Sequence, residues 1–427
     1  MTLGIVDVGT NSIHLLIGIL GLNGKFHVML KERDLTRLGE GGLAKGRLTR
    51  RAMHRALEVL RRYAATITRC HVDRVEAVAT SAVREAANGR SFLRRVRAKA
   101  KLPLRVISGR EEARLIYLGV ISAHRVRRPA AIVTIGGGSA QIIHGNGARL
   151  GYVSSVPLGG ARLAQQFIRH DPPRPGEVAA LTKHVRRVWA PVVRAMRRHR
   201  WEHALGSSAT IQQLMTAAYL LTHRRHAPPT PRLSISRRSV AQLVRWLATS
   251  TAQERMQLPG LDPRREDLAL PTGVALLAWM EGCGVSRLFY APGSLREGLV
   301  IDYLIRHHQR RRAIEHPLAE LFSVDGEDMA VLRRPRAPTR RRGKRRATVG
   351  SRASPQGTDS RTPIRAGSSS WKGSMGRGRA PSCSCCSAGS CRKARPCSLP
   401  SGTPPSSSRR RRSSGRGPGP SPRSPSA

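Results

Sequence analysis

Residues 4–12 of this 427-residue chain read GIVDVGTNS, and residues 131–139 read AIVTIGGGS. Each stretch is an apolar run that ends in a glycine turn, and each is followed by a second apolar run, at 13–20 and at 140–145. Short runs rich in β-branched residues and bounded by turn residues are typical of strands. The pattern therefore predicts a strand–turn–strand unit in each half of the chain.

The elements that follow each unit come in a similar order. A third strand is expected at 25–34 after the first unit and at 150–159 after the second. Apolar residues that recur every three to four positions predict an amphipathic helix from Thr49 to Cys70. Further strands are expected at 75–80, 104–107, 203–206 and 287–293, and helices at 91–100, 111–123, 160–169, 177–198, 208–221, 237–248 and 295–308. This repetition predicts a duplicated α/β fold with a cleft between two lobes.

We place the first lobe at residues 1–125, the second at 126–310 and a tail at 311–427. Beyond about residue 325 the hydrophobic periodicity stops, and the chain becomes basic and rich in Ser, Pro and Gly, which predicts disorder. Three interpretations of this tail are open. It is an arm that binds polyanions, a solvated segment without a function of its own, or the product of a shifted reading frame. Five of the seven cysteines crowd into the tail without the paired spacing of a zinc site.

The charge is strongly cationic, with 76 Lys and Arg against 26 Asp and Glu. This favours polyanionic partners such as nucleic acid, polyphosphate or nucleotides. No apolar run approaches the roughly 18 residues of a membrane helix. The amino terminus has an acid at Asp7 and lacks a signal-peptide layout, and Cys70 and Cys283 stand alone in the body. We therefore expect a cytoplasmic protein without a disulfide scaffold.

Both glycine turns are candidate phosphate-binding loops. An acid at a strand tip, such as Asp7, can hold a metal ion or a water molecule. The backbone N–H groups and hydroxyls of the tight turn after it can wrap a phosphate, and consecutive glycines let the backbone approach an anion closely. The candidate phosphate-binding residues are Gly9, Thr10, Asn11 and Ser12 in the first loop, and Gly136, Gly137, Gly138 and Ser139 in the second.

Three further positions carry candidate chemistry. Glu112 lies in the first turn of an expected helix, where it either complements the helix dipole or acts as a general base. Arg84 follows an expected strand and could grip a phosphate. Ser208 lies in a small-residue turn before a helix, which suits an anion at the helix N-terminus. The histidines show no spacing typical of a metal site.

Seven blocks occur in a specific order over residues 1–305, namely DVGTNSIH, TSAVREA, ISGREEARLIYLGV, IGGGS, GSSATI, PGLDPRRED and GSLREG. In this order they resemble the exopolyphosphatase/guanosine pentaphosphate phosphohydrolase (Ppx/GppA) family. The resemblance implies two ribonuclease-H-like lobes of the actin-like, sugar-kinase and Hsp70 superfamily, with an interlobe cleft. It also implies removal of a terminal phosphate from polyphosphate or guanosine pentaphosphate with a divalent metal, expected to be Mg²⁺.

The resemblance also assigns roles to residues. Glu112 matches the glutamate that activates the attacking water, Arg84 matches the arginine that grips phosphate, and Asp7 is the expected metal ligand. The chain departs from the family pattern at the second loop, where Thr134 and Gln141 replace two acids. Ala209 likewise replaces a glycine in the turn at 206–210. Because phosphoryl transfer depends on a metal and positioned charges, these changes affect metal binding and turnover while the backbone loops remain.

The leading hypothesis is therefore a cytoplasmic, metal-assisted phosphohydrolase that acts on polyphosphate or guanosine pentaphosphate. The main alternative is a weakly active or inactive sensor that binds polyphosphate or an alarmone. An actin-like-fold kinase and a nucleic-acid-binding protein are weaker alternatives. The expected partners are polyphosphate or guanosine pentaphosphate as substrate and a second copy of the chain in a homodimer. We expect no association with a membrane. Nucleic acid is expected to bind only nonspecifically, through the tail.

Overall fold

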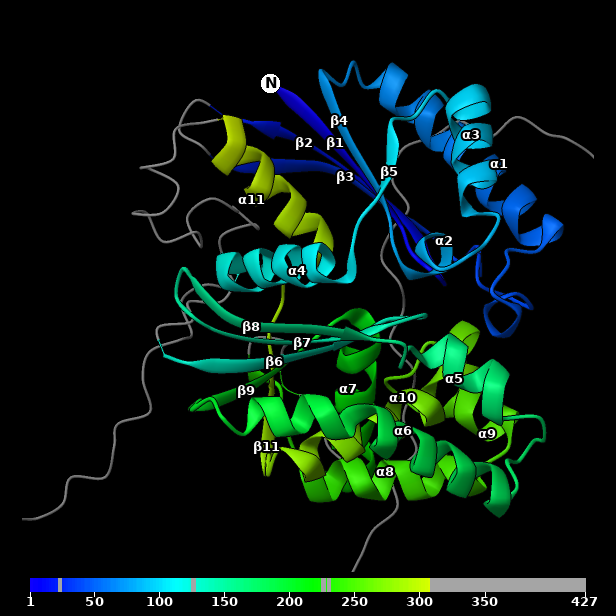
Figure 1. Ribbon diagram of the computed structural model, residues 1–427, viewed down its shortest axis with the longest axis vertical. Coiled ribbons are helices and arrows are strands. Elements are labelled where there is room, and N and C mark those ends of the chain that lie inside the picture. The colour runs from blue at the N-terminus through cyan, green and yellow to red at the C-terminus, as the bar shows by residue number, and fades with distance from the viewer. Residues whose placement is uncertain (22–24, 124–127, 224–227, 229–231, 308–427) are drawn as a thin grey trace, which may run out of the picture. The chain divides into compact units, whose positions relative to one another are not determined.

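The computed structural model describes residues 1–21, 25–123, 128–223, 228 and 232–307 (Figure 1). All of them belong to one compact unit of the chain. The last described residue is His307, so the tail for which disorder is predicted lies outside the described residues. None of the helices described is both long and apolar enough to traverse a lipid bilayer.

The first sheet is built around the opening strand of the chain. Its strand order is β3-β2-β1-β4-β5. The first three strands pair antiparallel, whereas β4 and β5 are added in parallel. Their bounds are β1 Thr2–Val8, β2 Ile13–Leu20, β3 Phe26–Asp34, β4 Arg74–Ala79 and β5 Leu104–Val106.

The second sheet repeats this order. It runs β8-β7-β6-β9-β11, with β10 added antiparallel to β11 at the far edge. The strands are β6 Ala130–Ile135, β7 Ala140–Asn146, β8 Arg149–Val156, β9 His203–Ser207, β10 Ser234–Ser236 and β11 Arg287–Tyr290. Because β6 occupies the place of β1, and β7 and β8 those of β2 and β3, the two lobes share one topology. The expected fold class, a duplicated α/β architecture with ribonuclease-H-like lobes, is confirmed.

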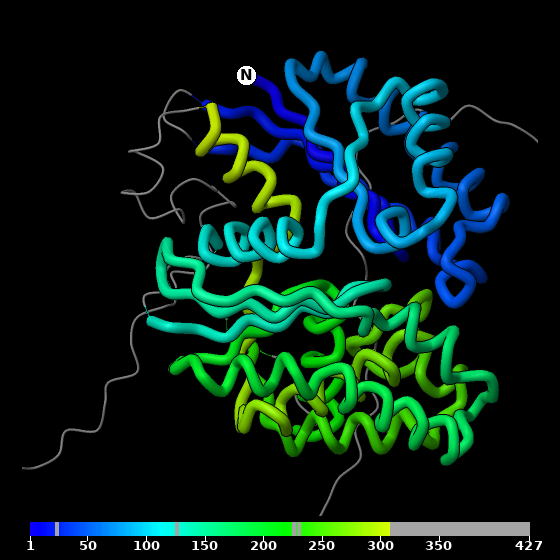
Figure 2. The backbone as a smooth tube through the Cα atoms, viewed as in Figure 1, coloured from blue at the N-terminus to red at the C-terminus, as the bar shows by residue number. Residues whose placement is uncertain are grey.

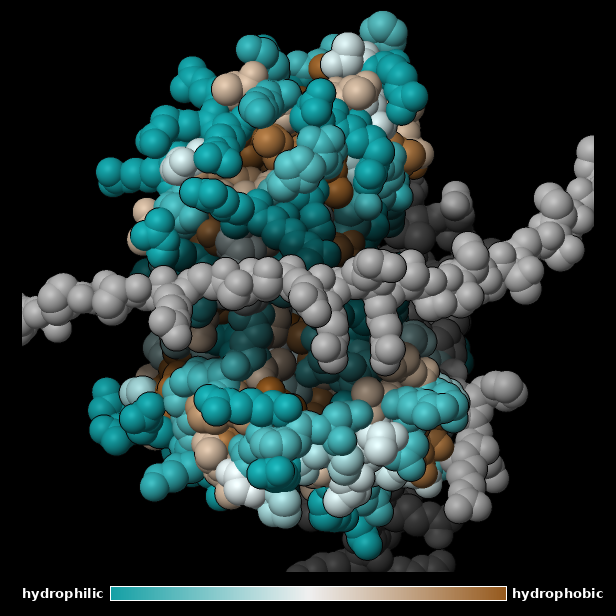
Figure 3. Space-filling view, turned by 90° about the vertical axis from the view of Figure 1, so that its right-hand side faces the viewer, coloured by the Kyte–Doolittle hydropathy of each residue, from teal (hydrophilic) through white to brown (hydrophobic). Residues whose placement is uncertain are grey.

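Helices cover these sheets. In the first lobe they are α1 Arg50–Arg69, α2 Ser81–Arg84, α3 Gly89–Ala100 and α4 Gly109–Ala123, with the short 3₁₀ helix η1 Leu43–Lys45. In the rest of the chain they are α5 Gly160–Phe167, α6 Pro175–Met196, α7 Ala209–His223, α8 Arg237–Thr249, α9 Ala252–Gln257, η3 Pro263–Arg265, α10 Glu266–Gly282 and α11 Leu295–His307. On the face shown in Figure 3, hydrophilic side chains predominate and hydrophobic ones are scattered, as expected where apolar faces pack inward.

The helix α1 shows how the sequence pattern becomes structure. Its N-cap residue Thr49 accepts a hydrogen bond from the backbone N–H of Ala52 at 3.2 Å, which satisfies one free donor of the first turn. Met53, Leu57 and Leu60 recur on one face and are buried against the first sheet. The helix predicted from Thr49 to Cys70 is thereby confirmed.

The helix α10 was not expected from the sequence. It is apolar on nearly all sides, so its sequence lacks the polar face that gives an amphipathic helix its period. It also contains Pro271, which usually ends or kinks a helix. In the folded chain it packs against α5, α6, α7 and α8, and the burial of nearly every residue from Leu268 to Met280 is the reason that it carries no polar stripe.

The helices α4 and α11 join the two sheets. α11 comes from the end of the described chain but packs on α4 and on β1 (Figure 2). α4 in turn contacts β7 and β8 of the second sheet. Their buried side chains share one core with strands of both sheets, including Ile5 of β1, Leu299 of α11 and Ile132 of β6. This shared core sets how the two lobes face each other.

Two buried tryptophans provide a test of packing against hydrogen bonding. Trp189 donates its indole N–H to the carbonyl oxygen of Ala275 at 2.9 Å, whereas the indole N–H of Trp279 has no partner in the part of the chain that is described. Both residues are at most 1% exposed, so Trp→Phe removes similar packing from each. We expect Trp279→Phe to cost less unfolding free energy than Trp189→Phe, by about 1–3 kcal/mol, because it removes an unpaired buried donor. Urea denaturation measures the unfolding free energy of both variants. Equal losses would contradict the conclusion that Trp279, unlike Trp189, has an unpaired indole N–H.

Candidate functional site

A cavity of about 170 Å³ lies between the two lobes. It is formed where β1 and β6 end in their glycine turns and where α4, α7 and α11 begin. The residues expected from the sequence that line it are Asp7, Gly9, Thr10, Asn11, Ser12, Glu112, Gly136, Gly137, Gly138, Ser139 and Ser208. The tertiary structure thus brings together groups that are up to about two hundred residues apart in sequence.

The first loop is a tight turn between β1 and β2. The N–H of Gly9 donates to the carbonyl oxygen of Ser12 at 3.0 Å. Thr10, Asn11 and Ser12 are all buried. The side-chain amide nitrogen of Asn11 has no hydrogen-bond partner among the described residues, so a buried donor is available beside the cavity.

The second loop repeats this turn and touches the first. The N–H of Gly136 donates to the carbonyl oxygen of Ser139 at 2.9 Å. A Cβ atom at Gly138 would lie 2.5 Å from the hydroxyl oxygen of Thr10 and 2.6 Å from that of Ser81. Any side chain larger than hydrogen at this position would therefore force the two loops apart.

Glu112 lies in the first turn of α4 and is 7% exposed. Its carboxylate accepts a hydrogen bond from the guanidinium of Arg84 at 2.9 Å. Burial raises the pKa of Glu112, and the contact with Arg84 opposes that rise. Arg84 also donates to the carbonyl oxygen of Ile107 and is not among the residues that line the cavity. The arginine expected to grip phosphate thus lies behind the candidate base and holds it.

Ser208 lines the cavity in a left-handed backbone conformation, with φ of 96°. Its hydroxyl donates to the carbonyl oxygen of Ile135 at 3.2 Å and accepts from the N–H of Ile211 at the start of α7. The turn at 206–210 is thereby tied to the base of the second loop. A positive φ at a serine is uncommon, which is consistent with a conformation imposed by the site.

Three cationic or titratable residues that were not predicted from the sequence as site residues also line the cavity: Arg265, Arg296 and His14. Arg265 donates to the hydroxyl of Ser12 at 3.0 Å, and its other two guanidinium nitrogens Nε and Nη1 are buried without a described partner. Arg296 lies 3.2 Å from Nδ1 of His14. Burial and the nearby arginines lower the pKa of His14 to about 2, so this imidazole is neutral. The sequence signal was present, because Arg265 and Arg296 lie in the blocks PGLDPRRED and GSLREG.

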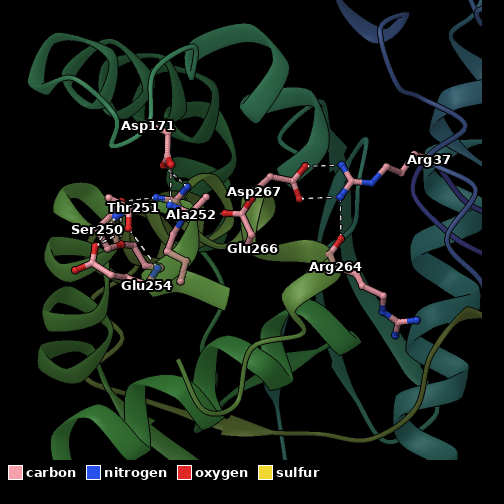
Figure 4. Close-up of polar contacts among 11 residues, drawn as sticks. Arg37, Asp171, Ser250, Thr251, Ala252, Glu254, Arg264, Glu266 and Asp267 are labelled. Atoms are coloured by element: carbon pink, nitrogen blue, oxygen red, sulfur yellow. Dashed lines mark hydrogen bonds and ion pairs between the residues drawn. The ribbon is translucent and has the colours of Figure 1, made fainter. Parts of the chain in front are cut away.

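Ion pairs on both sides of Arg265 fix its backbone. Arg37 of the first lobe donates to Asp267 at 2.8 Å and to the carbonyl oxygen of Arg264 at 2.8 Å (Figure 4). Glu266 pairs at 2.9 Å with Arg255, a buried guanidinium that also binds Asp171 and the carbonyl oxygen of Ser250. The segment that carries Arg265 is therefore held from the first lobe on one side and from the second lobe on the other.

The carboxylates that could hold a metal are few. Only Asp7 and Glu112 line the cavity with a carboxylate, and no group of three potential ligand side chains gathers anywhere among the described residues. Mg²⁺ usually binds one or two protein carboxylates and takes its other ligands from substrate phosphates and water. Asp7, with the hydroxyls around it, fits a metal of this kind. Thr134 and Gln141, which replace the expected acids, are both buried and lie directly opposite each other in the β6–β7 pairing.

Asp7 gives a prediction that is independent of activity. Burial raises its pKa to about 7, although the charge of Arg296 opposes the rise. Because the folded protein holds this proton more tightly than the unfolded chain, stability falls as the pH rises from about 4 through 7. In the presence of a chelator, Asp7→Asn should therefore raise the melting temperature, and raise it more at pH 8 than at pH 6.

The control for this prediction is Glu297, which lies nearby on α11. Arg296 and a hydrogen bond from Ser294 lower the pKa of Glu297 despite its burial. Its stabilising contribution is complete at both pH values. Glu297→Gln should accordingly lower the melting temperature at both pH values, and slightly less at pH 8, where it also removes the repulsion between Glu297 and ionised Asp7. If Asp7→Asn behaves in the same way as Glu297→Gln, Asp7 does not carry the raised pKa.

Comparison with known proteins agrees with this geometry. The model of the Ppx/GppA phosphatase family matches residues 21–307. An exopolyphosphatase from Cytophaga hutchinsonii is 28% identical, with a TM-score of 0.64, over 71% of this chain and 97% of its own. The Ppx/GppA family member from Aquifex aeolicus is 26% identical, with a TM-score of 0.60, over 72% of this chain and 99% of its own. The resemblance seen in the sequence is confirmed, and the chain belongs to the Ppx/GppA phosphatase family.

Proposed function

We propose that this protein is a phosphohydrolase that releases the terminal phosphate of inorganic polyphosphate or of guanosine pentaphosphate. The observation that supports this most directly is the contact between two phosphate-type loops beside a buried glutamate. Gly138 of one loop approaches Thr10 of the other so closely that no Cβ fits, and Glu112 lines the same cavity. Membership of a phosphatase family supports the same reaction class.

In the proposed reaction the terminal phosphate lies between the two loops. Their backbone N–H groups, the amide of Asn11 and the free guanidinium nitrogens of Arg265 are the donors for its oxygens. A water molecule lies between Glu112 and the phosphorus atom, and Glu112 accepts its proton as the water attacks in line with the leaving oxygen. Arg84 orients the carboxylate of Glu112 through their 2.9 Å hydrogen bond.

Mg²⁺ would be held by Asp7 and by phosphate oxygens of the substrate. When bound there, it supplies positive charge that offsets the negative charge of the phosphoanhydride. The nearby hydroxyls of Thr10, Ser12 and Thr134 add neutral oxygen donors to the same region. The role of Mg²⁺ stays a prediction. The homodimeric state and the cytoplasmic location of the protein stay predictions as well.

Of the two substrates, we favour polyphosphate. The described part of the cavity lining contains no Phe, Tyr or Trp that could stack on a guanine base, and its one aromatic ring, the imidazole of His14, lies 3.2 Å from Arg296. The cavity of about 170 Å³ has room for terminal phosphates, while the rest of the substrate extends into solvent. Inorganic polyphosphate requires only anion-binding groups of the kind that line this site.

The alternative function is a sensor that binds polyphosphate or an alarmone with little turnover. The observation that favours it is the replacement of two expected acids by Thr134 and Gln141. The side-chain amide of Gln141 donates to the hydroxyls of Ser139 at 2.9 Å and Ser155 at 3.2 Å. This neutral network stabilises the second loop and adds no charge for a metal.

Glu112→Gln tests the mechanism. The amide keeps the shape of the side chain but cannot accept the proton, so kcat for phosphate release from polyphosphate should fall by roughly 10²–10⁴-fold. The matched control is Glu111→Gln, because Glu111 pairs with Arg105 outside the cavity and should not affect kcat. Tight polyphosphate binding by wild-type protein without phosphate release, with or without Mg²⁺, would favour the sensor.

Restoring the expected acids tests the metal assignment. Thr134→Asp combined with Gln141→Glu should strengthen Mg²⁺ binding and raise kcat, because a divalent ion prefers anionic oxygen ligands. The hydroxyls of Ser139 and Ser155 can rotate to donate to a carboxylate, so the second change keeps these hydrogen bonds. Titration of Mg²⁺ by calorimetry and by activity measures the effect. An unchanged metal dependence would show that positions 134 and 141 do not face the metal.

A further inference from the structure

A chain of polar contacts leads from the second loop to Glu112 through Arg162 and Glu85, which have no role in the mechanism above, and then through Arg84. It begins at Arg162, in the first turn of α5. The backbone N–H of Arg162 donates to the carbonyl oxygen of Gly137 at 3.1 Å, and its side-chain Nε donates to that of Gly138 at 2.8 Å. Arg162 thus holds two carbonyl groups of the second loop, and does so from the second lobe.

The other end of the same guanidinium reaches the first lobe. Nη2 of Arg162 donates to the hydroxyl of Ser81 at 3.3 Å and to the carboxylate of Glu85. Ser81 in turn donates to Glu85 at 2.6 Å. These contacts form only when the second loop lies against α2, where Gly138 leaves no space for a Cβ beside Ser81.

Glu85 also lies next to the arginine that holds the candidate base. Its carboxylate is 3.8 Å from Nη2 of Arg84, while Nη1 of Arg84 is 2.9 Å from the carboxylate of Glu112. The order Arg162, Glu85, Arg84, Glu112 alternates positive and negative charges. Arg84 therefore has two competing carboxylates within reach, and it makes its short hydrogen bond to Glu112.

The competition depends on Arg162. An arginine shared by two carboxylates lies closer to the one whose charge is less compensated by other groups. Arg162 compensates Glu85 directly, which leaves Arg84 free to bind Glu112. Without Arg162, the uncompensated charge of Glu85 would draw Arg84 away and leave the buried Glu112 without its partner.

We propose that Arg162 and Glu85 are positioning residues that keep Arg84 on Glu112 when the second loop is seated against the first lobe. The proposal rests on the proposed function, because it takes Glu112 as the base. It links the phosphate-binding loop of one lobe to the orientation of the base on the other. The side chain of Arg162 is 16% exposed and that of Glu85 38%, so both changes needed for a test occur outside the apolar core.

The test compares Arg162→Gln, Glu85→Gln and the double variant, using phosphate release from polyphosphate. We expect Arg162→Gln to lower kcat on the order of 10-fold, within the range of coupling between charges in contact. Adding Glu85→Gln should restore most of that loss, because it removes the carboxylate that competes for Arg84. A scaffold role for Arg162 would instead give a double variant that is as poor as Arg162→Gln or poorer.

Conservative and matched variants complete the design. Arg162→Lys keeps a charge against Glu85 and should retain more kcat than Arg162→Gln, with melting temperatures recorded for each. The matched control is Arg186→Gln. Arg186 forms an ion pair of 3.0 Å with Glu281, and neither residue lines the cavity, so this variant should leave kcat unchanged. If Arg162→Gln does not fold, Arg162→Met, which also removes the charge but keeps a long aliphatic stem, gives the same comparison with and without Glu85→Gln.

The outcomes separate this inference from the proposed function. A large loss of kcat in Glu112→Gln, together with no rescue by Glu85→Gln where position 162 is neutral, would overturn the positioning role alone. No loss in Glu112→Gln would overturn the proposed function, and with it the premise of the inference. A large loss in Glu112→Gln and a rescue by Glu85→Gln would support both.

Discussion

The contact between the two glycine loops is the constraint on which the site depends. Gly138 packs against Thr10 and Ser81, and a Cβ at Gly159 would lie 2.3 Å from backbone atoms of Gly138. A side chain at Gly159 would therefore collide with the backbone of the second loop, so this close approach requires glycine. Because each loop follows the first strand of its own sheet, this contact limits how far apart the lobes can lie at the cavity, while the core shared by α4 and α11 joins the lobes elsewhere.

Charge is arranged around this contact in pairs. The carboxylate of Glu112 is compensated by Arg84, Glu85 by Arg162, and Asp267 by Arg37. The last two pairs cross between the lobes, so closure of the cavity and compensation of charge occur together. Two groups in the lining, Nη1 of Arg265 and the amide nitrogen of Asn11, have no hydrogen-bond partner among the described residues and are donors that a phosphate can satisfy. The carboxylates named here are thus compensated within the protein, while donors remain available in the cavity for an anion.

The duplicated topology explains why such a site is built from two equivalent turns. β1 and β6 hold the same place in their sheets, and each ends in a turn closed by the same N–H to carbonyl hydrogen bond. The two turns are not chemically equal, however. Asp7 near the end of β1 contributes an acid, whereas Thr134 near the end of β6 contributes a hydroxyl. The two turns are therefore alike in backbone and unlike in charge, and among the described residues the acids that line the cavity, Asp7 and Glu112, belong to the first lobe.

The sequence by itself determined the strand–turn–strand units, the amphipathic helix α1 and the candidate loop residues, because these depend on local periodicity and on glycine. It did not indicate α10, because a helix buried on all sides has no period to detect. It named Arg84 as a phosphate ligand but did not indicate the hydrogen bond of Arg84 to Glu112. That partner, like the role of Arg162, arises from residues distant in sequence whose charges become neighbours only when the lobes meet. Only the tertiary structure decided these pairings, since the attraction between charges depends on their separation in space.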